Sequence, residues 1–306
     1  MKICFNMSGV GLANNGGSRT LIRCAETLTN LGYDAFFWSG KSRYTWHDAK
    51  IKLVSSKTPP KCDVLIATGA NSYESTASFS GLRAAYVRGL ELWKAKESRL
   101  LELFRKMDVV FVNSEWQKCY LEGHNIASIL QYPGIDDWFF VKNPDELPNR
   151  VGIGALCNTR HKTKKSKDID ALINSYGLPI HQLNKDIKRP TREQLNNWYN
   201  RLGIWFSPSE LEGLHNPPYE AILAGCVVVA TNAVRGGTSD YVIHDKTGLV
   251  YQAGNLTEAA TYINRLVRDT SYRLRLWKNA NDLVRTKFGT RDVRMAEFAQ
   301  RLKEQL

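Results

Sequence analysis

The sequence predicts an α/β protein of two domains, each built on a parallel sheet. Three observations support this fold class. The 306 residues suit two domains of about 150 residues each. Short apolar runs alternate with amphipathic stretches, which is the pattern of parallel βαβ units. The stretch 137–150 (DWFFVKNPDELPNR) interrupts this alternation with two prolines and several charges, and it is expected to link the domains.

The first domain is expected over residues 1–140. It opens with a buried strand at 2–7, because the start MKICFNMSGVG is a poor signal peptide. A loop at 8–17 with four glycines leads to a helix over 18–31, for which Ser18 is the expected N-cap. The remaining elements are, in order, strands at 35–38, 63–67, 84–87 and 109–112, a helix at 114–124, and a strand at 128–131.

The second domain is expected over residues 148–285, where the alternation starts again. Its expected elements are, in order, strands at 151–156 and 203–206, a helix at 218–224, and strands at 227–230 and 248–251. The tail 257–306 has a strongly helical pattern with charge on one face.

Composition excludes some classes of protein. Apolar residues make up 43% and charged residues 24%, which argues against disorder. No window approaches the ~18 apolar residues of a spanning helix. The six cysteines form no CxxC pair, so we expect reduced thiols, a cytoplasmic protein and no metal site. The net charge of +12 suits an anionic lipid surface, nucleic acid or an anionic small ligand, without choosing among them.

The pair Gly16-Gly17 precedes the first predicted helix. Backbone N–H groups at a helix N-terminus bind anions, and glycine lets a phosphate approach closely. The chain has neither the GxGxxG pattern here nor a Walker lysine, which disfavours NAD and P-loop sites. A plain tight turn is the alternative interpretation of these two glycines.

The most informative stretch is 207–231 (SPSELEGLHNPPYEAILAGCVVVAT). Glu212 and Glu220 are eight residues apart, and Pro217-Pro218 open a helix that contains Glu220. A carboxylate near a helix N-terminus is stabilised by the helix dipole and can accept hydrogen bonds from sugar hydroxyls. By spacing alone, two solvated glutamates and a capped helix remain an alternative.

This string resembles the E-x7-E signature of the retaining glycosyltransferases of family 4. Their GT-B fold has two Rossmann-like domains with parallel sheets facing a central cleft. Residues 236–250 resemble the family's GGxxEIVxDGxTGLLV segment, and residues 16–38 resemble its N-terminal segment. The resemblance implies that the first domain binds the acceptor, that residues 148–285 bind the donor, and that 286–306 pack back on the first domain. It implies no cofactor beyond the nucleotide diphosphate sugar, which is the donor substrate.

The resemblance also implies roles for single residues. Glu220 would hold the ribose hydroxyls of the donor, and Glu212 would contact the transferred sugar. The loop between them would present backbone amides to the donor; its members are Gly213, Leu214, His215 and Asn216. His215 and Asn216 replace the family's common Gly-Leu, so His215 would add a side-chain donor or change the sugar preference.

A basic cluster at 160–167 (RHKTKKSK) follows the first strand of the second domain. The family carries here an Arg and a Lys that clamp the donor pyrophosphate. Arg160 matches the Arg, and either Lys165 or Lys167 matches the Lys. Fixed cations stabilise the charge that develops on a leaving diphosphate, which elsewhere is a task of Mg²⁺. A solvated basic loop is the alternative.

The acceptor is the least determined part of the prediction. The family's usual His-Asp pair is not recognisable; instead Arg88 and Glu91 follow the strand at 84–87, as site candidates or as a surface ion pair. The expected acceptor is a glycan or a lipid-linked glycan, approached through peripheral association with an anionic membrane surface. The alternatives are a modified base in DNA, a non-enzymatic nucleic-acid-binding protein, and a phosphorylase or epimerase on the same scaffold.

Overall fold

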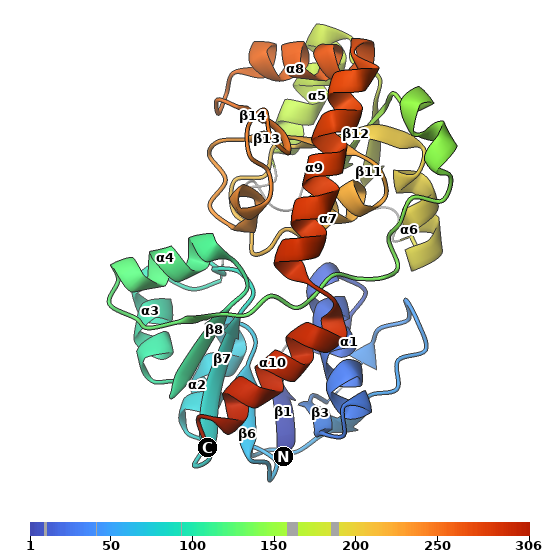
Figure 1. Cartoon of the computed structure of the whole chain (residues 1–306). Coiled ribbons are helices and arrows are strands. Elements are labelled where there is room, and N and C mark those ends of the chain that lie inside the picture. The colour runs from blue at the N-terminus through green and yellow to red at the C-terminus, as the bar shows by residue number, and fades with distance from the viewer. Residues whose placement is uncertain (9–10, 41, 93, 158–164, 185–189) are drawn as a thin grey trace. The chain divides into compact units, whose positions relative to one another are not determined.

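The computed structural model describes residues 1–8, 11–40, 42–92, 94–157, 165–184 and 190–306 (Figure 1). The chain divides into two compact units. Unit 1 comprises Met1–Gly134 and Phe288–Leu306, and unit 2 comprises Ile135–Lys287. The N-terminal unit thus takes its last part from the C-terminal end of the chain. Each unit is described by itself.

Unit 1 is built on a parallel sheet whose strand order is β5-β3-β1-β6-β7-β8-β9 in the described residues. The strands are β1 (Lys2–Asn6), β3 (Asp34–Trp38), β5 (Lys52–Val54), β6 (Val64–Ala67), β7 (Leu82–Val87), β8 (Val109–Val112) and β9 (Ile129–Leu130). A separate parallel pair joins β2 (Leu12–Ala13) to β4 (Ser42–Arg43). The order runs both ways from β1, which is the doubly wound arrangement of Rossmann-like domains.

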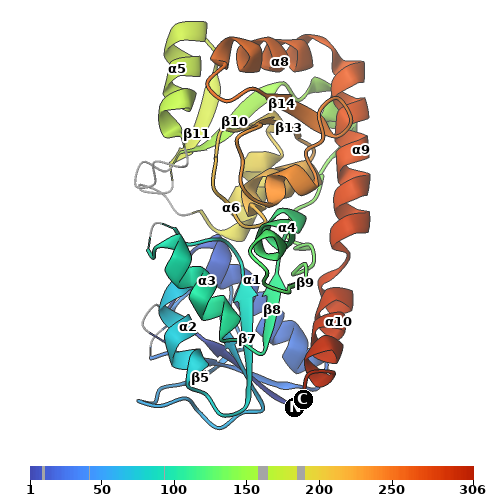
Figure 2. The same ribbon diagram turned by 90° about the vertical axis from the view of Figure 1, so that its left-hand side faces the viewer.

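Helices cover both faces of this sheet, because successive strand residues point to opposite faces and both sets are apolar. One face, which includes Phe5 and Tyr86, packs against α1 (Gly16–Asn30) and α10 (Arg291–Lys303). The other face, which includes Val87 and Val112, packs against α2 (Ala70–Ala77), α3 (Glu97–Arg105) and α4 (Glu115–Gly123). Figure 2 shows α2 and α3 on one side of this sheet and α10 on the other.

The start of α1 differs from the sequence-based prediction. The helix begins at Gly16, so the two glycines form its first turn instead of the preceding loop. Asn15 is the N-cap, and its side chain accepts a hydrogen bond from the Ser18 amide at 2.8 Å. Asparagine caps helices as well as serine does. Because two glycines follow Asn15, the sequence did not show that the helix begins there.

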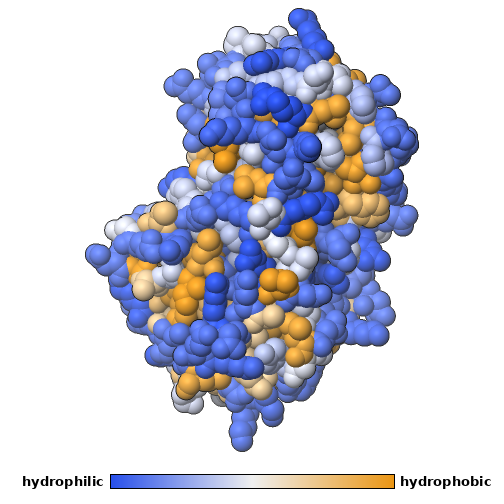
Figure 3. Space-filling model, in the orientation of Figure 1, coloured by the Kyte–Doolittle hydropathy of each residue, from blue (hydrophilic) through white to orange (hydrophobic). Residues whose placement is uncertain are grey.

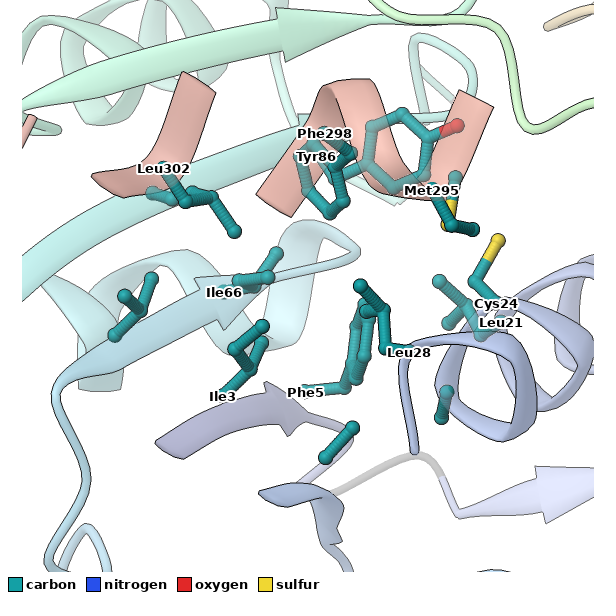
Figure 4. Close-up of a cluster of buried hydrophobic side chains, with 14 of the residues drawn as sticks. Ile3, Phe5, Leu21, Cys24, Leu28, Ile66, Tyr86, Met295, Phe298 and Leu302 are labelled. Carbon is teal, nitrogen blue, oxygen red and sulfur yellow. The ribbon is translucent and has the colours of Figure 1, made fainter. Parts of the chain in front are cut away.

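The helix α10 completes the core of unit 1 (Figure 4). Met295, Phe298 and Leu302 are fully buried among residues from β1, β6, β7 and α1. Figure 4 shows these three side chains pointing from α10 toward the sheet. Truncation of a buried phenylalanine costs about 3–5 kcal/mol, so this helix contributes strongly to the stability of unit 1.

Unit 2 has a second parallel sheet, with strand order β11-β10-β12-β13-β14 in the described residues. The strands are β10 (Gly152–Cys157), β11 (Ile180–Asn184), β12 (Leu202–Ser207), β13 (Val227–Thr231) and β14 (Gly248–Tyr251). The helices are α5 (Ser166–Tyr176), α6 (Arg192–Tyr199), α7 (Asn216–Leu223), α8 (Leu256–Arg268) and α9 (Thr270–Phe288), with 3-10 turns η1 (Pro144–Asn149) and η3 (Gly237–Asp240). Helices α5, α8 and α9 bury one face of this sheet.

The stretch 137–150, expected as a linker, lies within unit 2. Phe139 and Leu147 are buried, and the Arg150 guanidinium donates to the carbonyl of Ala224 at 3.0 Å. The prolines and charges of this stretch therefore mark an irregular segment of unit 2 that contacts α6 and the end of α7. Figure 3 shows a face that is mostly hydrophilic, with several smaller hydrophobic areas. None of the helices in the described residues is long and apolar enough to span a membrane.

Candidate active site

The candidate site in unit 2 lies at the carboxyl ends of three neighbouring strands, β10, β12 and β13. The loop after β12 carries Glu212 and leads into α7, which carries Glu220. The segment after β13 contains η3, and Lys165 occupies the N-cap position of α5, the helix that follows β10. In open parallel sheets, ligands bind at the carboxyl ends of the strands.

The carboxylate of Glu212 is held by two neighbours from its own loop. Oε1 accepts a hydrogen bond from Ser209 Oγ at 2.5 Å, and Nε2 of His215 lies 3.1 Å from the same oxygen. The other ring nitrogen of His215, Nδ1, lies 2.8 Å from Thr238 Oγ1. Since both ends of the imidazole are bonded, its orientation is fixed, and so is that of the carboxylate it contacts.

The backbone of His215 is itself unusual. It is the N-cap of α7 with φ 62° and ψ 72°, the left-handed region that favours glycine. Its carbonyl oxygen accepts a hydrogen bond from the Tyr241 hydroxyl at 2.8 Å. Burial raises the pKa of Tyr241 well above its ordinary value, so this hydroxyl stays a neutral donor. Such strained conformations persist where the surroundings enforce them, often at functional sites.

A short pairing with the segment after β13 fixes the loop that carries Glu212. The Glu212 amide donates to the Arg235 carbonyl at 3.1 Å, and the Gly237 amide donates to the Gly213 carbonyl at 2.5 Å. Gly236, with φ 152°, lies between these bonds, and a Cβ built on it would lie 2.2 Å from the Glu212 carbonyl oxygen. Only glycine fits there, so Gly236 serves the close approach of two backbones.

Glu220 is deeply buried, with 2% of its surface exposed. Its Oε2 accepts a hydrogen bond from the Tyr199 hydroxyl at 3.2 Å. Tyr199 belongs to α6 and packs edge-on against Trp205 of β12, with ring centroids 5.3 Å apart. A buried carboxylate requires hydrogen-bonding partners, and Tyr199 supplies one from a helix that the motif does not include.

The two candidate clamp lysines differ in their surroundings. Lys165 is the N-cap of α5, with φ 52°, and its Nζ lies 3.1 Å from Glu210 Oε1 in the loop after β12. Lys167 is exposed two residues further along the chain, in the first turn of the helix. The pKa of Asp168 is raised above its ordinary value, mainly by burial. Lys165 acts against this shift, and Glu210 adds to it. Arg160 lies outside the described residues.

The other predicted site residues fall into two places. In unit 2, Leu214 is 2% exposed, so its side chain packs in the protein and only its backbone could face a ligand. Gly213 lies two residues before the His215 cap, and Asn216 is the first residue of α7. Gly16 and Gly17 lie in unit 1, in the first turn of α1. The described residues contain no group of three or more His, Cys, Asp or Glu side chains that could hold a metal ion.

Sequence reasoning missed the residues that support the two glutamates. Tyr199 lies 21 positions before Glu220, on a helix that no motif marks. Ser209 and Thr238 lie inside stretches that resemble the family, but their contacts depend on how the two loops meet. Only the pairing of these loops through Gly236 could have indicated that Thr238 lies near Glu212.

Comparison with known proteins relates this unit to a family. Residues 153–283, which lie within unit 2, match the family Glycosyl transferases group 1. A curated relative is the capsular polysaccharide biosynthesis glycosyltransferase CapM of Staphylococcus aureus, 28% identical over 97 residues. That match covers 32% of this chain and 25% of the length of CapM.

Solved structures match nearly the whole chain. Anabaena Alr3699/HepE in complex with UDP and glucose has a TM-score of 0.80 at 16% identity, covering 99% of this chain and 100% of that one. Sucrose-phosphate synthase from Thermosynechococcus elongatus has a TM-score of 0.76 at 14% identity, covering 99% and 98%. The predicted GT-B fold class is therefore confirmed, and so is the prediction of a glycosyltransferase domain.

Proposed function

We propose that this chain transfers a sugar from a nucleotide diphosphate sugar to a hydroxyl group of a glycan, with retention of the anomeric configuration and without a metal ion. Glu220 holds the ribose hydroxyls of the donor, and Glu212 contacts the sugar that is transferred. The products are the glycosylated acceptor and a nucleoside diphosphate.

The observation that carries the proposal is the support around the two glutamates. Ser209 and His215 hold one oxygen of Glu212, and Tyr199 holds one oxygen of the buried Glu220. A carboxylate with a fixed orientation binds paired sugar hydroxyls at a small entropic cost, because the protein does not have to order it on binding. The two residues lie on either side of the start of α7, which suits one ligand with a ribose and a hexose.

Charge at the same end of the sheet supports a diphosphate donor. Lys165, whose Nζ pairs with Glu210, stands at the start of α5. Together with Arg160, it would stabilise the negative charge that grows on the diphosphate as the glycosidic bond breaks. The starts of α5 and α7 add helix N-termini that favour anions.

The relatives favour a particular donor and acceptor. HepE is solved with UDP and with UDP-glucose, and CapM acts in capsular polysaccharide biosynthesis. We therefore propose a UDP-sugar as the donor and a growing polysaccharide or lipid-linked glycan as the acceptor.

Thermal stabilisation by UDP, GDP, ADP and dTDP sugars tests the donor site. A ligand at 100 times its Kd stabilises the folded chain by about 2.7 kcal/mol, so one nucleotide family should raise Tm clearly. Glu220→Ala should abolish the shift, whereas Glu193→Ala, an exposed glutamate on α6, should keep it. If none of these sugars stabilises the protein, the proposed function is wrong.

Retention is tested separately, by NMR of the first product formed. The stabilising donor is incubated with a panel of glycans, and the anomeric coupling constant of the new linkage is compared with that of the donor. A product of opposite configuration would rule out retention while leaving the donor site intact.

A further inference from the structure

The loop after β12 carries a third glutamate, Glu210, for which the proposed function gives no role. It lies three residues after the end of β12, at the carboxyl end of the sheet of unit 2. The donor proposed for this end of the sheet is an anion, and a carboxylate placed next to an anion opposes its binding. The presence of Glu210 here therefore requires an explanation.

The backbone of Glu210 is held by the segment after β13. Its carbonyl oxygen accepts a hydrogen bond from the Arg235 amide at 2.8 Å, and the Arg235 carbonyl accepts one from the Glu212 amide at 3.1 Å. Leu211, between the two glutamates, forms a parallel bridge with Arg235 and is buried. The carboxylate of Glu210 is thus carried by a backbone that is fixed on both sides.

The partner of this carboxylate is Lys165. Its Nζ lies 3.1 Å from Glu210 Oε1, and the two side chains are 39% and 33% exposed. The backbone of Lys165 is also fixed, because it is the N-cap of α5 and its carbonyl oxygen accepts a hydrogen bond from the Asp168 amide at 2.9 Å. Since about a third of each side chain faces solvent, a ligand can reach the pair.

A second carboxyl group lies close to the same lysine. Asp168 stands in the first turn of α5, and the charges of Lys165 and Glu210 both act on its pKa, in opposite directions. Asp168 and Glu210 also add to the rise that burial causes in the pKa of Tyr251, at the end of β14. The ammonium of Lys165 is therefore near two carboxyl groups, and Glu210 makes the direct contact.

An ion pair of this kind can be exchanged for a stronger one. Pairs with this much exposure are weak, because water and salt screen them. A diphosphate carries more negative charge than one carboxylate, so it can take the ammonium of Lys165 from Glu210. The free energy lost with the old pair is subtracted from the affinity for the new ligand.

We propose that Glu210 competes with the donor diphosphate for the ammonium of Lys165, and that this competition limits the affinity for the nucleoside diphosphate product. Glu210 is a positioning residue, because it acts through Lys165 and touches none of the reacting atoms. The inference rests on the proposed function and adds a means of product release: as the diphosphate leaves, the carboxylate pairs with the lysine again. Product release limits turnover in many enzymes, so a weaker hold on the product favours turnover.

The test measures the affinity of the full chain for UDP by calorimetry. Glu210→Gln removes the charge but keeps the length of the side chain and an oxygen that accepts from Nζ. Glu193→Gln is the matched control, because it makes the same change at an exposed glutamate on α6. We expect Glu210→Gln to bind UDP about threefold more tightly or better, and Glu193→Gln to bind it as the unmutated chain does.

Uridine, which carries no phosphate, separates the effect of charge from an effect of loop structure. Its affinity should be the same in Glu210→Gln and in the unmutated chain. A glutamate that only supported the loop would give weaker binding of UDP when replaced. Equal or weaker UDP binding in Glu210→Gln, or a gain of the same size for uridine, would overturn the inference.

A double-mutant cycle tests whether Glu210 acts through the lysine. Lys165→Met should weaken UDP binding, and adding Glu210→Gln to it should bring no further gain. UDP affinity unaffected by Lys165→Met, or a gain from Glu210→Gln as large as with the lysine present, would overturn the competition. Failure of the proposed function has a different signature, because nucleotide stabilisation is then absent or insensitive to Glu220→Ala.

Discussion

Nε2 of His215 lies 3.1 Å from Oε1 of Glu212, so a loop histidine positions the carboxylate that is proposed to contact the sugar. The sequence predicted His215 as a residue that either donates to the ligand or changes the sugar preference. The bonds of both ring nitrogens to protein atoms favour a role through Glu212 instead. Because a carboxylate only accepts, Nε2 carries the proton in this pair.

Replacement of His215 by glycine tests this role without straining the backbone, since glycine accepts the left-handed conformation. We expect kcat/KM to fall by about tenfold or more, because a hydrogen bond to a charged group contributes about 1.5–3 kcal/mol. Nucleotide affinity should stay unchanged. Asn125→Gly, another left-handed residue but in unit 1, is the control for backbone effects. Normal turnover in His215→Gly would make the histidine a purely structural cap.

The second prediction concerns Glu220 and Tyr199. Glu220→Ala should weaken nucleotide binding by about 1.5–3 kcal/mol, measured by calorimetry, because charge-assisted hydrogen bonds to the ribose are lost. Tyr199→Phe removes only the hydroxyl that holds Oε2, so we expect a smaller loss of about 0.5–1.5 kcal/mol. Unchanged nucleotide affinity in a folded Glu220→Ala protein would remove this glutamate from the site.

The third prediction separates the clamp lysines. Lys165 pairs with Glu210 in the site loop, and Lys167 is exposed, so Lys165→Ala should have the large kinetic effect and Lys167→Ala the small one. Arg160→Ala should lower kcat/KM by about 10²-fold, with a fall in kcat as well as a rise in donor KM. Steady-state kinetics of the three variants tests which residues contact the diphosphate. Near-normal values in all three would make the cluster a solvated loop.

The fourth prediction is that turnover survives chelation. Because Arg160 and a lysine are proposed to supply the positive charge at the diphosphate, excess EDTA should leave the rate of UDP release within about twofold. The control adds Mg²⁺ or Mn²⁺ back after chelation. Activity that disappears with EDTA and returns with either cation would contradict the clamp.

The fifth prediction is a pH effect at Asp168. Burial holds its pKa above the ordinary value of 3.8, and Glu210 acts in the same direction, so ionisation costs stability in the folded state. The stabilising contribution of the protonated form is complete at low pH and disappears as the pH rises through the folded pKa. Asp168→Asn should therefore raise Tm at pH 7, and the difference should shrink toward pH 3. Thermal melts across this range check it; a Tm at pH 7 below that of the unmutated chain would contradict the effect of burial.

Much of the fold was predictable, because parallel strands buried on both faces appear as apolar runs such as 109–112 and 227–230. Helix boundaries were less predictable, because Asn15 and Ser18 are equally good caps and only the folded turn distinguishes them. At the site, the glutamates were predictable from a local motif. Their supports were not, because the contact of Tyr199 with Glu220 joins separate helices.

Membership of α10 in unit 1 has a consequence for synthesis of the protein. Domains usually fold in order as they leave the ribosome, the N-terminal one first. Here the first 134 residues emerge without Met295, Phe298 and Leu302, which fill their core. Unit 2 precedes α10 in the chain, so the first 134 residues expose an apolar sheet face until that helix emerges. That interval is when chaperones would bind this face.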